Sequence, residues 1–272
     1  MRYLLIFLFT CNLYASNNSW IPVISDRENF QFSDAISEHT QIKLVDLNRV
    51  GPTQRITVRD LLSSVRGKNL LLITHGFNMT YTYSLDQFTI YHKHFHKKYD
   101  QIIGYLWPGG NQWWEYRHAR RRTLDELPYR LLATISQLKA VSKNVDILAH
   151  SMGCRLTLEM LNLSAIPLVR NLFLTAPAVS STALQLDQTY HEATHNSKHV
   201  YVFHSKNDEV ASYAFPIVEG DRSLGLEGAK HPDLLPFNVT MIDCSHCVDS
   251  HSGYDNALFF KSYVKKILSP KS

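Results

Sequence analysis

The sequence has few cysteines, few glycines and prolines for its length, and little net charge. Four cysteines in 272 residues are too few for a disulfide-stapled scaffold. The 11 glycines and 10 prolines follow no period and no block repeats, which excludes collagen-like and solenoid architectures. A formal net charge of +4 is too weak to indicate nucleic-acid binding without a patterned basic face.

What the chain does have is the material for a substantial core. Hydrophobic residues make up 44% of it, and there are 14 Tyr, 13 Phe and 4 Trp. This composition excludes intrinsic disorder. The length suits one large domain or two small ones.

The N-terminus has the pattern of a secretory signal. Met1-Arg2 precedes the apolar run Tyr3–Phe9, and Ala15 is followed by polar residues. The run is too short to span a bilayer as a helix. We therefore expect a signal peptide over 1–15 and an exported protein, in preference to a buried first strand or a lipid anchor at Cys11. Export would place the remaining cysteines, Cys154, Cys244 and Cys247, in an oxidising compartment.

Beyond residue 40, short apolar runs alternate with helical patterns, and no linker divides the chain. Near-continuous apolar runs are typical of parallel strands buried on both faces. The pattern predicts a single doubly wound, mostly parallel α/β sheet with helices on both faces, spanning 40–270 after an N-terminal extension over 16–39. The expected strands are Ile42–Leu47, Leu70–Thr74, Ile102–Trp107, Val145–Ala149, Leu172–Thr175, Val200–His204 and Val239–Ile242.

In such sheets the ligand binds beyond the carboxyl ends of the strands, so the residues that follow each strand are informative. Ser151 follows one strand, with Ala149 and Gly153 two positions to either side and a helical pattern after it. Only small residues fit there, because the turn brings the two Cβ positions close together. The pattern indicates a nucleophile elbow, although an ordinary strand-to-helix turn could have the same residues.

Another strand is followed by His75-Gly76-Phe77-Asn78. A glycine at position 76 lets the backbone approach a bound oxygen. The N–H groups of Phe77 and Met152 would then form a two-donor oxyanion hole. A plain turn is the alternative interpretation.

An acid and a base follow two later strands. Asp208 lies in a short turn where a carboxylate can hold an imidazole, and His251 lies in the loop before the last helical pattern. With Ser151 they stand in the chain order Ser, Asp, His, each on a separate strand-end loop. This order is the one that α/β-type serine hydrolases require.

The chain resembles an α/β-hydrolase, and is similar to a poorly characterised bacterial group with H-G-[FY]-N, W-P, A-H-S-M-G and S-H-S-x-Y segments. Here these are His75–Asn78, Trp107-Pro108, Ala149–Gly153 and Ser250–Tyr254, within a similarity that covers roughly 68–268.

The resemblance implies Ser151 as nucleophile, His251 as base and Asp208 as the acid that orients it. It favours His251 over the competing His246. Asp249 competes with Asp208 but lies only two residues from His251, so the two side chains cannot easily face each other. Two departures are Ala149, where the superfamily prefers glycine, and Cys154, where that group has a polar residue.

The loop that begins at Trp107 is expected to border the site. Trp113 and Trp114 either line an acyl pocket or rest at a lipid interface, unless they pack against the sheet. The expected substrate pocket comprises His75, Asn78, Trp107, Trp113 and Trp114. The basic run that follows favours a solvated helix face over recognition of anionic head groups. It comprises Arg117, Arg120, Arg121 and Arg122.

Two other constellations have alternative interpretations. The residues His191-Glu192-Ala193-Thr194-His195 match the H-E-x-x-H pattern of zinc metalloproteases, but the surrounding polar sequence favours a solvated surface helix. Cys244 and Cys247 either form a tight disulfide or remain as thiols.

From the sequence we predict an exported serine hydrolase, esterase-like or lipase-like, that cleaves carboxylic esters and needs no cofactor and no metal. The alternatives are a peptidase or amidase of the same fold, a zinc metalloprotease that uses His191 and His195, and a non-catalytic binding protein. The expected partner is a small-molecule or lipid ester and not a nucleic acid. Peripheral membrane contact and the oligomeric state are left open.

Overall fold

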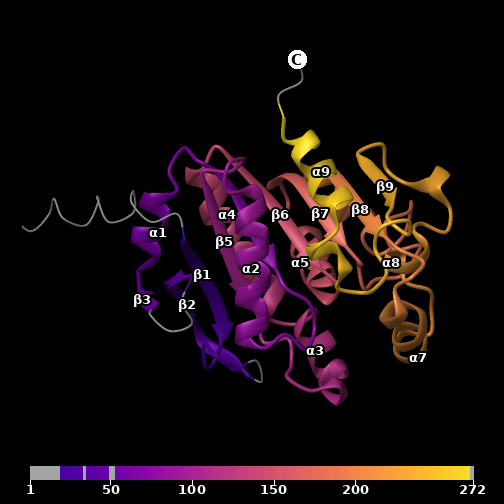
Figure 1. Ribbon diagram of the computed structural model, residues 1–272, viewed down its shortest axis with the longest axis horizontal. Coiled ribbons are helices and arrows are strands. Elements are labelled where there is room, and N and C mark those ends of the chain that lie inside the picture. The colour runs from indigo at the N-terminus through magenta and orange to yellow at the C-terminus, as the bar shows by residue number, and fades with distance from the viewer. Residues whose placement is uncertain (1–18, 33–34, 49–52, 270–272) are drawn as a thin grey trace, which may run out of the picture.

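The structure is a computed structural model that describes residues 19–32, 35–48 and 53–269. The expected signal peptide over 1–15 and Cys11 lie outside the described residues. Within the described part, one nine-stranded sheet runs through the molecule, with helices packed on both of its faces (Figure 1).

The strand order in this sheet is β3-β2-β1-β5-β4-β6-β7-β8-β9. The seven strands β1, β5, β4, β6, β7, β8 and β9 pair in parallel, whereas β2 is antiparallel to both of its neighbours, β1 and β3. The carboxyl ends of all described strands except β2 therefore point to the same edge of the sheet. The strands are β1 (Trp20–Arg27), β2 (Ile36–Asp46), β3 (Thr53–Arg55), β4 (Asn69–Thr74), β5 (Gln101–Leu106), β6 (Asn144–His150), β7 (Val169–Thr175), β8 (Ser197–His204) and β9 (Val239–Asp243).

The central strands are buried because both of their faces carry apolar side chains. In β4, Leu70 and Leu72 point into one core, whereas Leu71 and Ile73 point into the other. Successive side chains of a strand point to opposite faces, so an unbroken apolar run serves two helical layers at once. This confirms the expected doubly wound α/β class.

The two helical layers are built from amphipathic segments. α2 and α9 cover the near face of the sheet in Figure 1, and Phe88 and Phe260 are among the buried residues they contribute. α1, α4 and α5 pack on the other core. None of the described helices combines the length and the apolar character needed to cross a bilayer. The helices are α1 (Val58–Ser64), α2 (Tyr81–Phe95), α3 (Tyr116–Arg122), α4 (Leu127–Val141), α5 (Met152–Asn162), α6 (His191–His195), α7 (Phe215–Glu219), α8 (Leu224–Glu227) and α9 (Leu258–Ile267).

The expected domain boundary at residue 40 needs correction, because the sheet begins at Trp20. β1 pairs with β5 in parallel and with β2 in antiparallel register. Its last three residues, Ser25, Asp26 and Arg27, are polar yet fully buried. The Tyr105 hydroxyl donates to Asp26 at 2.6 Å. The described strand residues of the segment 16–39, which are 20–27 and 36–39, therefore belong to the sheet.

Candidate active site

Ser151 lies at the sharp turn between β6 and α5, with φ 54° and ψ −123°. L-residues rarely adopt a positive φ, and such strain is concentrated at functional sites. The turn is held from both sides, because the Ser151 N–H donates to the Thr175 carbonyl at 2.9 Å and the Ser151 carbonyl accepts from Ala178 N–H at 3.2 Å. The fold thus fixes the direction of the serine side chain.

Ser151, His251 and Asp208 form a continuous hydrogen-bonded chain at the carboxyl edge of the sheet. His251 Nε2 lies 2.8 Å from Ser151 Oγ, and His251 Nδ1 lies 2.7 Å from Asp208 Oδ2. An ionised carboxylate can only accept, so Nδ1 carries the proton and Nε2 accepts from the serine hydroxyl. That tautomer is the one in which an imidazole can remove the hydroxyl proton.

Asp208 is fully buried, whereas the His251 side chain is 15% exposed. The Ala211 N–H donates to Asp208 Oδ1 at 2.8 Å, so each carboxylate oxygen has a partner. A buried, fully hydrogen-bonded carboxylate holds its orientation, and through it the orientation of the imidazole.

A second histidine, which the sequence analysis did not single out, packs against this chain. The His150 ring lies 4.9 Å from the His251 ring, and its Nδ1 lies 3.1 Å from Thr175 Oγ1. Burial, and then the nearby His251, hold the pKa of His150 well below its usual value of 6.5. His150 therefore packs against the His251 ring as a neutral imidazole. In the sequence, only its position directly before Ser151 indicated that His150 would lie near the site.

The turn after β4 and the start of α5 approach each other so closely that there is no room for a Cβ atom at positions 76 and 153. A Cβ at Gly76 would lie 3.0 Å from the Ser151 Cβ, and one at Gly153 would lie 2.3 Å from the His75 carbonyl oxygen. Within the described part of the chain, neither Phe77 N–H nor Met152 N–H has a hydrogen-bond acceptor. The two expected oxyanion donors thus lie in turns that meet at Ser151.

His75 and Trp107 were expected to line the substrate pocket, and the structure corrects this. Both side chains are fully buried, with their rings stacked at 5.5 Å, and Trp107 Nε1–H donates to the His75 carbonyl at 2.8 Å. Arg27 from β1 donates to the Trp107 carbonyl at 3.1 Å and to His75 Nε2 at 2.9 Å. Burial and the Arg27 charge hold the pKa of His75 well below 6.5. Arg27, His75 and Trp107 thus form a buried cluster that stabilises the turn after β4.

The remaining expected pocket residues, Asn78, Trp113 and Trp114, shape a turn or face solvent. Asn78 adopts φ 56°, and its N–H donates to the Gly109 carbonyl at 3.0 Å, so it shapes the turn. Trp113 is 75% exposed and Trp114 is 62% exposed. This also overturns the interpretation that the two tryptophans pack against the sheet.

The competitors for the base and acid lie elsewhere. The His246 ring packs on Phe259 at 4.7 Å, and Asp249 is exposed. Cys244 and Cys247 carry free thiols. Burial, reinforced by Cys247, raises the pKa of the Cys244 thiol to about 12. Cys154 is buried in the core, where its Sγ lies 3.2 Å from the Ala149 carbonyl oxygen.

The H-E-x-x-H residues lie on α6, which immediately precedes β8 and therefore stands at the amino edge of the sheet. His191, Glu192 and His195 can each offer a ligand atom within 4.8 Å of the others. Glu192 and His195 are exposed. The cluster is thus separated from Ser151 by the length of the strands.

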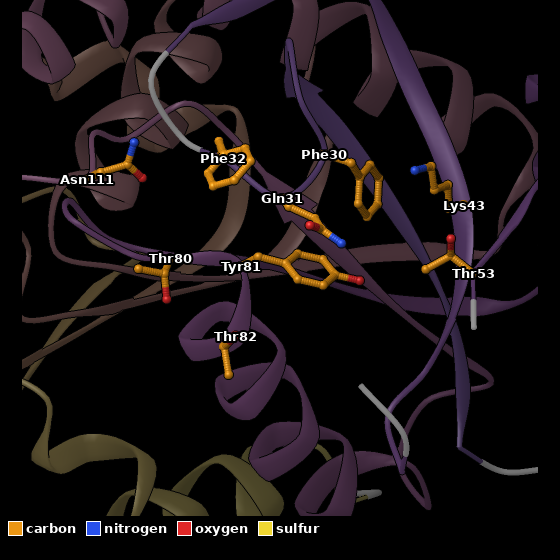
Figure 2. A pocket seen from close by; sticks show the side chains of 9 residues that line it. All are labelled: Phe30, Gln31, Phe32, Lys43, Thr53, Thr80, Tyr81, Thr82 and Asn111. Atoms are coloured by element: carbon orange, nitrogen blue, oxygen red, sulfur yellow. The ribbon is translucent and has the colours of Figure 1, made fainter. Parts of the chain in front are cut away.

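A hollow of about 350 Å³ lies beside β1 and the start of α2, and no member of the Ser151 chain lines it (Figure 2). Phe30 and Tyr81 meet edge to face at 5.7 Å, and Lys43 Nζ lies 4.2 Å from the centre of the Phe30 ring. Its lining comprises Phe30, Gln31, Phe32, Lys43, Thr53, Thr80, Tyr81, Thr82 and Asn111.

Comparison with a protein-family model agrees with this architecture. The sequence model of a family described as alpha/beta hydrolase of unknown function, DUF900, matches residues 52–234, and the chain belongs to this family. Among solved structures, an esterase from Pyrococcus furiosus is similar at 12% identity with a TM-score of 0.49, over 84% of this chain and 85% of the esterase chain. No curated protein matches the chain.

Proposed function

We propose that this hydrolase is an exported serine esterase, with Ser151 as nucleophile, His251 as general base and Asp208 as the acid that orients the base. The observation that carries the proposal is the unbroken hydrogen-bonded chain from Ser151 Oγ through His251 to Asp208, at 2.8 and 2.7 Å. Export rests on the N-terminal sequence pattern alone.

The first half of the reaction forms an acyl-enzyme. As Ser151 Oγ attacks the acyl carbonyl carbon, its proton moves to His251 Nε2, and Asp208 stabilises the resulting imidazolium. Negative charge develops on the carbonyl oxygen, which would face the N–H groups of Phe77 and Met152. A donor of this kind typically lowers the barrier by about 3 kcal/mol.

The first half ends when the protonated His251 gives its proton to the departing alcohol, and the bond between the acyl carbon and the alcohol oxygen breaks to leave the acyl-enzyme. In the second half a water molecule attacks the acyl-enzyme while His251 accepts its proton, which returns the enzyme to its starting state. Ser151 recovers its hydrogen as the acid product leaves. None of these steps requires a metal or an organic cofactor.

A fluorophosphonate probe tests the proposal directly, because it reacts with activated serines. We expect the protein to be labelled, and expect Ser151→Ala and His251→Ala to abolish labelling. A panel of ester and amide substrates assigns the bond type, with hydrolysis of esters expected and loss in Ser151→Ala. Persistent labelling of Ser151→Ala would place the reactive serine elsewhere, and preferential amide cleavage would identify a peptidase or amidase.

A further inference from the structure

Large apolar side chains project into solvent from two segments at the carboxyl edge of the sheet. Trp113 and Trp114 belong to the turn before α3, and are 75% and 62% exposed. Tyr213 and Ile217, just before and within α7, are 75% and 84% exposed. Figure 1 shows α3 and α7 projecting at the same end of the molecule. We call these four residues the apolar rim.

Each half of the apolar rim is attached to a component of the catalytic centre. Phe77, whose backbone N–H is an expected oxyanion donor, packs its ring edge to face on the ring of Tyr116 in α3, with 5.3 Å between the ring centres. On the other side, Asp208 accepts from Ala211 N–H at 2.8 Å, and Tyr213 follows two residues later. One half of the rim is thus connected to the turn that carries Phe77, and the other half to the loop that carries Asp208.

The two halves are also tied to each other. Glu219 of α7 accepts from Tyr116 OH at 3.2 Å and from Arg120 Nε at 2.7 Å, both on α3. Arg155 of α5, the helix that follows the nucleophile, lies 3.1 Å from the same carboxylate. The Glu219 side chain is only 8% exposed. The contacts of Glu219 hold α3 against α7, and in this arrangement the four residues of the apolar rim are exposed to water.

Basic side chains accompany the rim. Residues 113–122 contain four arginines and one acidic residue, Glu115, and Glu219 is the only acidic residue in 210–219. Arg117 and Arg121 are exposed and, within the described part of the chain, form no salt bridge. Exposed Trp and Tyr next to Arg is the composition that binds an anionic lipid–water interface.

We propose that the apolar rim, together with Arg117 and Arg121, docks the protein onto an anionic phospholipid surface. The catalytic edge then faces the membrane, and the substrates are acyl esters of lipids presented by it. This inference rests on the proposed serine esterase for its substrate class, whereas the docking itself does not require catalysis. Exposed apolar side chains that lie at one end of the molecule beside basic residues, in contrast to a single exposed residue such as Phe237, favour a surface that is covered during function.

Vesicle binding tests the docking separately from the chemistry. Ser151→Ala protein is mixed with vesicles of phosphatidylcholine alone or of phosphatidylcholine with phosphatidylglycerol, and co-sedimentation is measured. We expect binding to the anionic vesicles, weakened by salt, with a blue shift of tryptophan emission. Trp113 and Trp114 are expected to dominate that shift, because Trp107 is fully buried and the partly buried Trp20 stands at the start of β1, at the opposite edge of the sheet.

Variants locate the surface. Trp113→Ala/Trp114→Ala is expected to weaken binding at least about tenfold, and Arg117→Gln and Arg121→Gln about fivefold each. The matched control for the aromatic residues is Phe237→Ala, since Phe237 is 96% exposed just before β9, at the opposite edge. The control for charge is Lys265→Gln/Lys266→Gln on α9. Both controls are expected to bind like the parent protein.

The outcomes separate the two proposals. Absence of vesicle binding, equal binding to both vesicle types, or equal loss in Phe237→Ala would overturn docking by the apolar rim. Hydrolysis of a soluble short-chain ester by wild-type protein, lost in Ser151→Ala, supports the esterase whatever the vesicles show. Vesicle binding without hydrolysis of any ester would leave docking intact and defeat the proposed function.

Discussion

Two histidine clusters stand at opposite edges of the same sheet, and they are built in different ways. At the amino edge, His191, Glu192 and His195 come from one short helix and are close together in the sequence. At the carboxyl edge, His251 lies 100 residues from Ser151 in the chain, and only the sheet brings the two together. The cluster at the amino edge is the easier of the two to recognise in the sequence. Its Glu192 and His195 are exposed, however, and it lies apart from the hydrogen-bonded chain of Ser151, His251 and Asp208.

The difference shows what a fold adds to a set of reactive residues. At the carboxyl edge each group has a buried partner that fixes its direction, down to the Ala211 N–H that holds Asp208. At the amino edge, Glu192 and His195 face water, where a side chain keeps its rotational freedom. Preorganisation, and not the presence of histidine and carboxylate, distinguishes the two clusters.

The comparison is tested most severely by replacing the carboxylate of each cluster. We expect Asp208→Asn to lower kcat for ester hydrolysis by about 10⁴-fold, because an amide at this position no longer selects the tautomer that accepts the serine proton. Glu192→Gln is the matched change at the amino edge. It is expected to leave kcat unchanged, as is a chelator added to the wild-type enzyme.

The opposite outcome is equally clear. Activity that survives in Asp208→Asn but is lost in Glu192→Gln, or is removed by the chelator, would transfer catalysis to the amino edge and identify a metalloenzyme.

The tight packing at the elbow gives the next largest effect. Gly153→Ala places a Cβ about 2.3 Å from the His75 carbonyl oxygen, which belongs to the backbone and cannot swing away. We expect a loss of about 3 kcal/mol in unfolding free energy and a fall in kcat/KM of about 10²-fold, as the oxyanion donors separate. Urea unfolding and steady-state kinetics measure the two effects.

Gly220→Ala provides the control for that substitution. Gly220 has φ 71° and open space around it, so only the backbone conformation is strained. We expect a loss of about 1 kcal/mol with unchanged kcat/KM. An elbow that tolerates alanine as well as this loop does would show that the close approach to His75 is not required.

The smallest effect concerns acid stability. Burial and Arg27 hold the folded-state pKa of His75 well below 6.5, the value expected after unfolding. Below pH 6.5 the unfolded chain binds a proton that the folded chain refuses, so stability is fully present above that pH and falls as the pH decreases. His75→Asn is expected to reduce this dependence by about 1.4 kcal/mol per pH unit.

Urea unfolding at pH values from about 4 to about 7, around the ordinary histidine pKa of about 6.5, measures the dependence. His195→Asn is the control for removal of an imidazole as such, on the exposed helix at the amino edge. An equal change of slope in the two variants would remove the distinction between buried and exposed histidines.

The sequence was sufficient for the parts of the molecule that follow a simple pattern. The apolar runs at Leu70–Thr74 and Val145–Ala149 correspond to β4 and β6, since a strand buried on both faces needs apolar residues throughout. The elbow residues could be read because steric limits at Ala149 and Gly153 leave few choices. The chain order Ser, Asp, His then indicated which acid and which base belong with Ser151.

The features that escaped prediction depend on partners far away in the chain. β1 ends in Ser25, Asp26 and Arg27, and no local pattern indicates that these polar residues are buried. Their burial is stabilised by contacts such as Tyr105 OH to Asp26, which only the assembled sheet provides. Trp107 shows the same limit, because its burial depends on the His75 ring and the His75 carbonyl, which lie 32 residues away in the chain.

The reach of Arg27 has a consequence for how the enzyme matures. Its guanidinium meets the Trp107 carbonyl across 80 residues of chain, so the contact closes a long loop and forms only when β5 is in place. Because β1 pairs with β5 and Arg27 also contacts His75 and Trp107, β1 can complete its contacts only after residues 101–107 have been synthesised. The His75–Asn78 turn, which carries one of the expected oxyanion donors, gains the Arg27 contact only at that stage.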